Sequence, residues 1–197
     1  LPDRAVRLMR AFWPGPLSIV LPKSQLVPDI VTAGGPNVAL RCPDHPIALA
    51  LLFAFGKPLV GPSANTSGRI SPTAADHVRQ SFTTDQVYTL DGGTCGTGIE
   101  STVVSLIGDR AVILRPGVIG SHAISQVLHE DVLDSTITAP INTRQDAPGQ
   151  LASHYAPHAR AILFKDWHDL DGIIDMADGP VIVLTHSLLA EHNHTRY

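Results

Sequence analysis

Polar side chains stand at the ends of several apolar runs, where the edge of a sheet would gather them. Arg41 ends one such run, and Ser63 and Asn65 follow another. A guanidinium can clamp a carboxylate through two parallel hydrogen bonds, and hydroxyl and amide groups can both donate and accept. Ligands commonly bind at the carboxyl ends of strands. A salt bridge from Arg41 to Asp44 and a simple capped turn at Ser63 and Asn65 are the alternatives that these residues leave open.

A second polar group follows the glycine-rich stretch 93–98. Backbone N–H groups in such a stretch can wrap an anion. It is neither a P-loop nor a dinucleotide fingerprint, because no Gly-Lys-Ser/Thr follows and the next element is a strand. Taken alone, the stretch therefore favours a flexible connection. Ser101 lies at the mouth of the following strand, and Arg115 leaves the strand after it, where its charge can face a phosphate.

Other reactive residue types form no recognisable constellation. The ten histidines include no His-x-x-x-His pair on a convincing helix beside carboxylates, and no Gly-x-Ser-x-Gly motif occurs. Cys42 and Cys95 lie in unrelated contexts and predict neither a disulfide nor a zinc site, so we expect both thiols to be buried. We therefore predict no catalytic side chain and no protein-bound metal.

Hydrophobic periodicity predicts a succession of helices and strands around these residues. We expect helices at 3–12 and 47–55, a third that starts with Ser71 as N-cap and Pro72 in its first turn, and a fourth from the N-cap Ser121 to about 129. We expect strands at 17–21, 38–41, 59–61, 87–90, 101–107 and 111–114, the last two forming a hairpin.

The chain divides into three parts by composition. We predict a first domain at 1–130, a linker at 131–158 and the start of a second α/β domain at 159–197, with strands at 161–164 and 181–184 around a weak helix. The net charge is −4, with three lysines and no basic stripe, which disfavours a nucleic-acid-binding surface. No secretory signal or membrane-spanning run is visible, so we expect a soluble cytoplasmic protein.

The order of the motifs is more specific than any one of them. The chain resembles the threonylcarbamoyl-AMP synthase family, with its YrdC-type fold, in the segments Phe12-Trp13-Pro14-Gly15-Pro16-Leu17, Val38-Ala39-Leu40-Arg41-Cys42-Pro43, Pro62-Ser63-Ala64-Asn65-Thr66-Ser67-Gly68-Arg69, Ser71-Pro72-Thr73, Gly98-Ile99-Glu100-Ser101-Thr102 and Arg115-Pro116-Gly117. Two-domain members have a linker similar to Pro148-Gly149-Gln150 with His154-Tyr155-Ala156-Pro157.

The resemblance implies a YrdC-like twisted mixed sheet with flanking helices and a large concave cavity for ATP and threonine, followed by the start of a Rossmann-like domain. By position it assigns threonine contacts to Arg41, Ser63 and Ser101. It assigns ATP contacts to Asn37, Asn65, Thr73 and Arg115. The linker residues that it brings within reach of the ligand are His154 and Tyr155.

The implied reaction converts L-threonine, bicarbonate and ATP into threonylcarbamoyl-AMP and pyrophosphate, for the threonylcarbamoyladenosine modification of tRNA. The threonine amine adds to carbon dioxide, and the carbamate oxygen attacks the α-phosphate. Such a step needs positioning and charge compensation rather than a protein nucleophile, with Mg²⁺ bridging the triphosphate. The product would pass to the tRNA threonylcarbamoyl-transfer machinery.

One departure separates this chain from the family pattern. Members carry an N-terminal basic motif, with Lys and Arg a few residues apart, that grips the nucleotide, and nothing before Trp13 matches it. We therefore expect the isolated polypeptide to be inactive. Ala152 and Ser153 also replace basic residues that some members carry before the His-Tyr pair. The alternatives are an RNA-binding YrdC-type module with weak tRNA affinity and a carbamoyl-transfer relative with another substrate.

Overall fold

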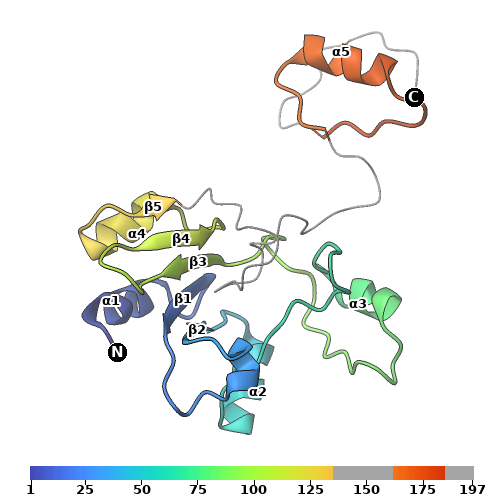
Figure 1. Cartoon of the computed structure of the whole chain (residues 1–197). Coiled ribbons are helices and arrows are strands. Elements are labelled where there is room, and N and C mark those ends of the chain that lie inside the picture. The colour runs from blue at the N-terminus through green and yellow to red at the C-terminus, as the bar shows by residue number, and fades with distance from the viewer. Residues whose placement is uncertain (135–161, 185–197) are drawn as a thin grey trace. The chain divides into compact units, whose positions relative to one another are not determined.

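The computed structural model describes residues 1–134 and 162–184, which belong to two separate compact units. The first unit contains the helices α1 (Asp3–Phe12), α2 (Pro46–Phe55), α3 (Ala75–Ser81) and α4 (Ser121–Leu128), and the short 3₁₀ helix η1 (Asp29–Thr32). Its strands are β1 (Leu17–Pro22), β2 (Asn37–Leu40), β3 (Thr102–Ser105), β4 (Val112–Arg115) and β5 (Leu133–Asp134) (Figure 1). The described part of the second unit contains the helix α5 (Trp167–Asp175).

The five strands form one mixed sheet in the order β2-β1-β3-β4-β5. β1 pairs antiparallel with β2 and parallel with β3, so the strand nearest the N-terminus lies between two later ones. β3 and β4 form the predicted hairpin, and β5 adds parallel to β4. The register places Ser18 opposite Val103, which brings the start of β1 beside the start of β3.

The two faces of the sheet differ in what covers them. Leu17, Ile19 and Leu21 of β1 pack with Leu8 of α1 and Ile124 of α4 in the main core, and all of these residues are buried. Because successive side chains of a strand alternate, the residues between them face the other way. There Val20 and Val103 form a small second cluster with the partly buried Leu114. The face without α1 and α4 therefore carries few apolar residues, and its polar residues Ser18 and Ser105 are buried beside the two valines.

Close packing at the end of α1 fixes how the chain enters the sheet. A Cβ atom at Gly15 would lie 2.2 Å from the carbonyl oxygen of Phe12, so only glycine fits there. The Gly15 N–H donates to the carbonyl of Cys42 at 2.9 Å, and the carbonyl of Pro16 accepts from the N–H of Thr102 at 3.0 Å. This turn thus joins the end of β2 to the start of β3.

Most of the predicted elements that contribute to the core are confirmed. α1 has the predicted bounds, β1 is one residue longer than predicted, and β2 is shifted by one residue toward the N-terminus. α2 begins at Pro46 and ends before Gly56, which adopts the left-handed conformation with φ of 70°. That geometry is typical of a glycine that closes a helix.

Two predicted strands are wrong. Neither 59–61 nor 87–90 pairs with another strand in the described part of the chain, and Val60 and Tyr88 are 69% and 90% exposed. Short apolar runs match the period of a strand, but a ladder also needs a neighbour in register, and the sheet offers none to these runs. The expectation that both thiols are buried is also wrong, because Cys95 is exposed and Cys42 is only partly buried.

Two predicted helix starts are also wrong. α3 begins at Ala75 rather than after Ser71, because the Ser71 hydroxyl donates to the carboxylate of Glu100 at 2.6 Å instead of capping a helix. Ser121 is the first residue of α4, and the N-cap is Gly120, which makes no side-chain cap. A serine beside a helix start is a weak guide to the exact cap, since the competing acceptor is set by the tertiary fold.

The second unit is described only around α5. Asp166 caps this helix, its carboxylate accepting from the N–H of Asp169 at 3.0 Å. The described parts of the two predicted flanking strands, 162–164 and 181–184, belong to no ladder within the described ranges, so those predictions are wrong. β5 lies inside the stretch predicted as linker, which otherwise falls outside the described residues.

α2 contributes little to the described core. Its sequence is almost entirely apolar, yet none of its residues is buried against the described parts of the chain, and Phe53 is 91% exposed. Helices that are apolar on every side are usually buried.

Across the ranges 1–134 and 162–184, no helix combines the length and apolar character needed to span a membrane.

Candidate functional site

The candidate site lies where β1, β3 and β4 bring a buried hydroxyl next to two guanidinium groups. Ser101 immediately precedes β3 and is 5% exposed, Arg115 ends β4, and Arg41 follows β2. The turn 14–16 links them, since its successive carbonyls accept from Arg41 and from Thr102. Three of the residues predicted from the sequence are therefore held at one place.

Arg115 holds Ser101 through both its backbone and its side chain. The Arg115 Nε and one terminal nitrogen donate to the Ser101 carbonyl at 3.1 and 2.9 Å, and the same terminal nitrogen donates to the Ser101 hydroxyl at 3.2 Å. A guanidinium presents its donors in a rigid planar fork, so this contact fixes the position of the serine. Ser101 Oγ also lies 2.8 Å from Ser18 Oγ.

Among the described residues, the carbonyl of Gly15 orients Arg41. Its Nε donates to the carbonyl of Gly15 at 3.0 Å, which leaves the two terminal nitrogens directed away from that bond. Partial burial, and then the nearby charge of Arg115, hold the pKa of the Arg41 guanidinium below its ordinary value. Two cations that disfavour one another in this way are stabilised by an anion bound beside them.

A second segment is tied to the site through Glu100. The carboxylate of Glu100 accepts from Ser71, as described above, and the carbonyl of Thr73 accepts from the N–H of Cys95 at 2.8 Å. The Thr73 hydroxyl lies 3.4 Å from Nδ1 of His77. Thr73 therefore lies on a loop anchored directly to the residue before Ser101.

Gly117 allows the segment after Arg115 to pass close to Ser101. A Cβ atom there would lie 2.5 Å from the backbone nitrogen of Thr102 and 2.7 Å from the carbonyl oxygen of Glu100. Both distances are too short for any real Cβ contact with backbone. The motif Arg115-Pro116-Gly117 thus combines a charged group with the one residue that fits the space beside the strand.

Asn65 has one unsatisfied polar atom. Its side-chain nitrogen donates to the carbonyls of Thr66 and Arg69 at 2.9 and 3.0 Å. Its Oδ1 is buried and accepts no hydrogen bond from the described residues. A buried oxygen without a donor is costly, so this atom suits a ligand that supplies an N–H or O–H group.

Two predicted contacts lie apart from the two arginines and Ser101. Ser63 is exposed and makes no hydrogen bond with another described residue. Asn37 begins β2, pairs with Pro22, and lies at the opposite end of that strand from Arg41. His154 and Tyr155 lie outside the described residues.

The glycine-rich stretch already has an anion beside it. The N–H of Gly93 donates to the carboxylate of Asp91 at 2.9 Å, and this bond is the main reason that the pKa of Asp91 lies below its usual value. A ring nitrogen of His45 lies 3.1 Å from the carbonyl of Gly92. The stretch 93–98 is therefore tied to the neighbouring Asp91 through Gly93 and to the distant Thr73 through Cys95.

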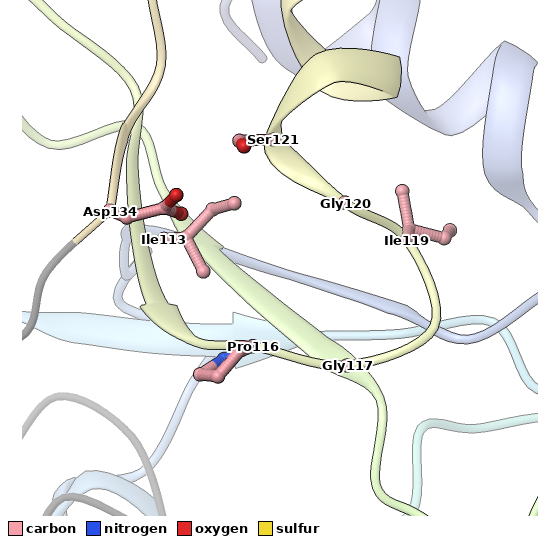
Figure 2. A pocket seen from close by; sticks show the side chains of 7 residues that line it. All are labelled: Ile113, Pro116, Gly117, Ile119, Gly120, Ser121 and Asp134. Carbon is pink, nitrogen blue, oxygen red and sulfur yellow. The ribbon is translucent and has the colours of Figure 1, made fainter. Parts of the chain in front are cut away.

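A pocket of about 260 Å³ lies beside the segment that follows Arg115, where Pro116 and Gly117 line it. Figure 2 shows Asp134 of β5 and Ser121 of α4 among its lining residues, with Ile113, Pro116 and Ile119. None of the residues predicted to bind threonine or ATP lines this pocket. The pocket therefore adjoins the candidate site at Gly117 but is not lined by the two arginines or Ser101.

Comparison with known proteins shows the family. Residues 1–117 match the Sua5/YciO/YrdC family model, which is described as telomere recombination. The chain belongs to the Sua5/YciO/YrdC family. Residues 119–194 match a second model, described as the C-terminal domain of threonylcarbamoyl-AMP synthase. The two matches follow one another along the chain, as in the two-domain form expected from the linker motif.

Curated relatives of this Sua5/YciO/YrdC chain are named threonylcarbamoyl-AMP synthase. One from Pyrococcus abyssi is 40% identical over 169 residues, which cover 86% of this chain and 50% of the relative. One from Bacillus subtilis is 43% identical over 159 residues, covering 80% of this chain and 46% of the relative. The chain thus spans about half the length of these relatives.

Solved structures of the family support the same fold. The crystal structure of P. abyssi Sua5 complexed with L-threonine superposes with a TM-score of 0.75 at 40% identity, covering 81% of this chain and 47% of that one. Escherichia coli YciO gives 0.53 at 27% identity, covering 63% and 61%. The YrdC-like mixed sheet predicted from the sequence is confirmed.

The sequence analysis did not identify Ser18 or the role of Gly117 in this site. Ser18 stands alone in the apolar run 17–21, and a single polar residue on an otherwise apolar strand is a usable signal. Gly117 was recognised only as part of a motif. Its steric role depends on contacts with residues 100–102 and has no sequence signal of its own.

Proposed function

We propose that this chain is the threonine- and ATP-binding part of a threonylcarbamoyl-AMP synthase, a nucleotidyltransferase that forms threonylcarbamoyl-AMP and pyrophosphate from L-threonine, bicarbonate and ATP. The observation that carries the proposal is the buried Ser101 hydroxyl held by Arg115 and joined to Arg41 through the turn 14–16. The names of the relatives, and the L-threonine bound in the P. abyssi structure, support it.

Arg41 is suited to the threonine carboxylate. Its Nε is already bonded to Gly15, and the two terminal nitrogens can donate in parallel to the two carboxylate oxygens. The charge that Arg115 adds nearby strengthens the preference for an anion. Ser101 would donate to or accept from the amino acid beside this clamp, and the exposed Ser63 would close it on binding.

The remaining predicted residues suit ATP. Arg115 would compensate charge on the phosphates, since its fork lies at the edge of the sheet. Thr73 brings a hydroxyl on the loop anchored to Glu100. The unpaired Oδ1 of Asn65 suits an N–H donor of the nucleotide. Asn37, at the far end of β2, would contact ATP only away from these groups.

Magnesium would be held mainly by ATP in this proposal. The described site offers guanidinium and hydroxyl donors, which suit anions, whereas Mg²⁺ prefers six oxygen ligands in an octahedral arrangement. We expect triphosphate oxygens and water to supply them. When bound, the ion would neutralise charge on the leaving pyrophosphate.

The proposed reaction balances without a protein nucleophile. The threonine nitrogen forms a bond to the carbon of carbon dioxide, derived from bicarbonate, and loses a proton to give a carbamate. A carbamate oxygen then bonds to the α-phosphorus as the bond to the β-phosphate oxygen breaks. The protein's contribution is to hold two anions together and to offset their charge, which the two arginines supply.

The linker and the destination of the product belong to the same proposal. This chain has one His-Tyr pair, at 154–155, and a P. abyssi Sua5 structure has been solved with an adjacent histidine and tyrosine both replaced by alanine. We propose that His154 and Tyr155 reach the ligand. The product would pass in the cytoplasm to the tRNA threonylcarbamoyl-transfer machinery.

Titration calorimetry with L-threonine and L-serine tests the proposal. We expect L-threonine to bind more tightly than L-serine, and Arg41→Ala and Ser63→Ala to weaken that binding. Arg79→Ala and Ser67→Ala are matched controls, because both residues are exposed and Arg79 pairs with Asp76. Equal affinity for the two amino acids, or wild-type affinity in Arg41→Ala, would contradict the proposal.

Two further assays separate the competing functions. Filter binding of tRNA at two salt concentrations should give at most weak retention, because the net charge is −4. Tight, salt-sensitive retention without ATP affinity would instead indicate an RNA-binding module. We also propose that the 197 residues alone do not turn over, so pyrophosphate release that depends on threonine and bicarbonate would contradict that part.

A further inference from the structure

Ser18 is a buried hydroxyl on the face of the sheet opposite α1 and α4. It is 9% exposed and lies between Leu17 and Ile19, which both face α1 and α4. Its side chain therefore faces the side on which Val20 and Val103 pack. Among the described residues its hydroxyl has one partner, the hydroxyl of Ser101, at 2.8 Å.

The hydrogen bonds around Ser101 can be counted atom by atom. Arg115 can only donate, so the Ser101 Oγ accepts from it at 3.2 Å. The bond between the two serines uses the hydrogen of one of them. Two hydroxyl hydrogens are available and one is used, so within the described residues one remains for a further acceptor.

A ligand oxygen at Ser101 decides the direction of this bond. If Ser101 donates to the ligand, its only remaining role toward Ser18 is that of acceptor, so Ser18 must donate. The Ser101 oxygen then accepts from both Ser18 and Arg115, and its own hydrogen is confined to the remaining tetrahedral direction. Without Ser18 the same hydroxyl could rotate about its C–O bond and would lose this orientation on average.

We propose that Ser18 is a positioning residue for the amino-acid substrate, acting by fixing the direction in which the Ser101 hydroxyl donates. This inference rests on the proposed function, because it takes threonine as the molecule that Ser101 contacts. Hydrogen bonds in a chain also polarise one another, so donation from Ser18 strengthens donation from Ser101. Ser18 does not itself touch the substrate in this arrangement.

Ser105 is a natural control for burial alone. It lies on β3 four residues after Ser101, points to the same side of the sheet, and is also 9% exposed. Among the described residues, its hydroxyl accepts from the N–H of Ile107 at 3.4 Å, within the β3–β4 turn. Removing it removes a buried hydroxyl without touching Ser101.

The test compares Ser18→Thr with Ser18→Val. Threonine and valine have the same shape, so the two variants differ only in the hydroxyl, whatever strain the added methyl groups cause. We expect Ser18→Thr to bind L-threonine roughly three- to tenfold more tightly than Ser18→Val, the range that one hydrogen bond provides. Both variants should bind ATP equally, and Ser105→Ala should bind L-threonine like the unsubstituted chain.

The outcomes separate this inference from the proposed function. Absence of L-threonine binding by the unsubstituted chain would remove the proposed function, and with it the substrate on which the role of Ser18 depends. Binding by the unsubstituted chain, with equal affinities in Ser18→Thr and Ser18→Val, would overturn only the role of Ser18. An equal loss of threonine and ATP affinity in Ser18→Val would also overturn it, because it would indicate a structural effect.

Discussion

Replacing Gly117 by alanine should damage both the fold and the candidate site. The added Cβ would lie 2.5 Å from the Thr102 nitrogen and 2.7 Å from the Glu100 carbonyl oxygen. To reach an ordinary contact of 3.4 Å, the first distance must lengthen by about 0.9 Å. Both neighbours are backbone atoms of the segment that carries Ser101, so the strain cannot be relieved by turning a side chain.

The expected magnitude follows from the usual cost of overpacking. Inserting one carbon into a tightly packed site costs about 1–3 kcal/mol of unfolding free energy. For a chain of this size that lowers the melting temperature by roughly 3–10 °C. Because Ser101 lies between the two displaced residues, we also expect its hydrogen bonds to Arg115 to lengthen and L-threonine affinity to fall about tenfold or more.

Thermal unfolding followed by circular dichroism, together with threonine calorimetry, provides the assay. Gly108→Ala is the control, since a Cβ atom there meets nothing within 4 Å, and we expect it to leave both quantities nearly unchanged. If Gly117→Ala melted and bound threonine like the unsubstituted chain, the reasoning from close approach would be refuted.

Three further predictions follow from other contacts. Arg4→Ala should lower the unfolding free energy by about 1–2 kcal/mol, because it removes the hydrogen bonds and the ion pair that join α1 to the β3–β4 turn and the end of α4. In denaturant unfolding, the control Arg10→Ala should change this free energy little, because Arg10 is exposed. L-threonine at ten times its Kd should raise the unfolding free energy by about 1.4 kcal/mol, and Arg41→Gln should largely abolish the rise; a rise kept in that variant would contradict the assignment of the carboxylate site. NMR titration should give Asp91 a pKa below that of an ordinary aspartate, mainly because the Gly93 N–H donates to its carboxylate. The stability that this bond adds is present above the unfolded-state pKa and is lost as pH falls through the folded-state pKa. An unshifted pKa of Asp91 would disprove the contact.

The residues predicted best were those whose place follows from the ends of strands. Arg41, Ser101 and Arg115 each adjoin a strand that periodicity identified, and the sheet order then brings Ser101 and Arg115 into direct contact. Local sequence carries this information because strand ends, turns and apolar runs are set by nearby residues. The YrdC-like mixed sheet followed from the resemblance carried by the order of motifs.

What failed depended on contacts between distant segments. Ser71 looks like a helix cap, but its partner Glu100 lies 29 residues later and only the fold brings them together. Val60 and Tyr88 lie in runs with the period of a strand, but no strand in the described ranges pairs with them. The importance of Ser18 likewise depends on Ser101, 83 residues away. Single-sequence patterns do not carry such partners.

An experimental structure of the chain with bound L-threonine tests the central claim most directly. The account predicts the carboxylate within about 2.7–3.2 Å of the terminal nitrogens of Arg41, with the Ser101 hydroxyl in hydrogen-bond contact with the same molecule. Threonine found instead in the pocket beside Ile113 and Asp134, away from both residues, would contradict it.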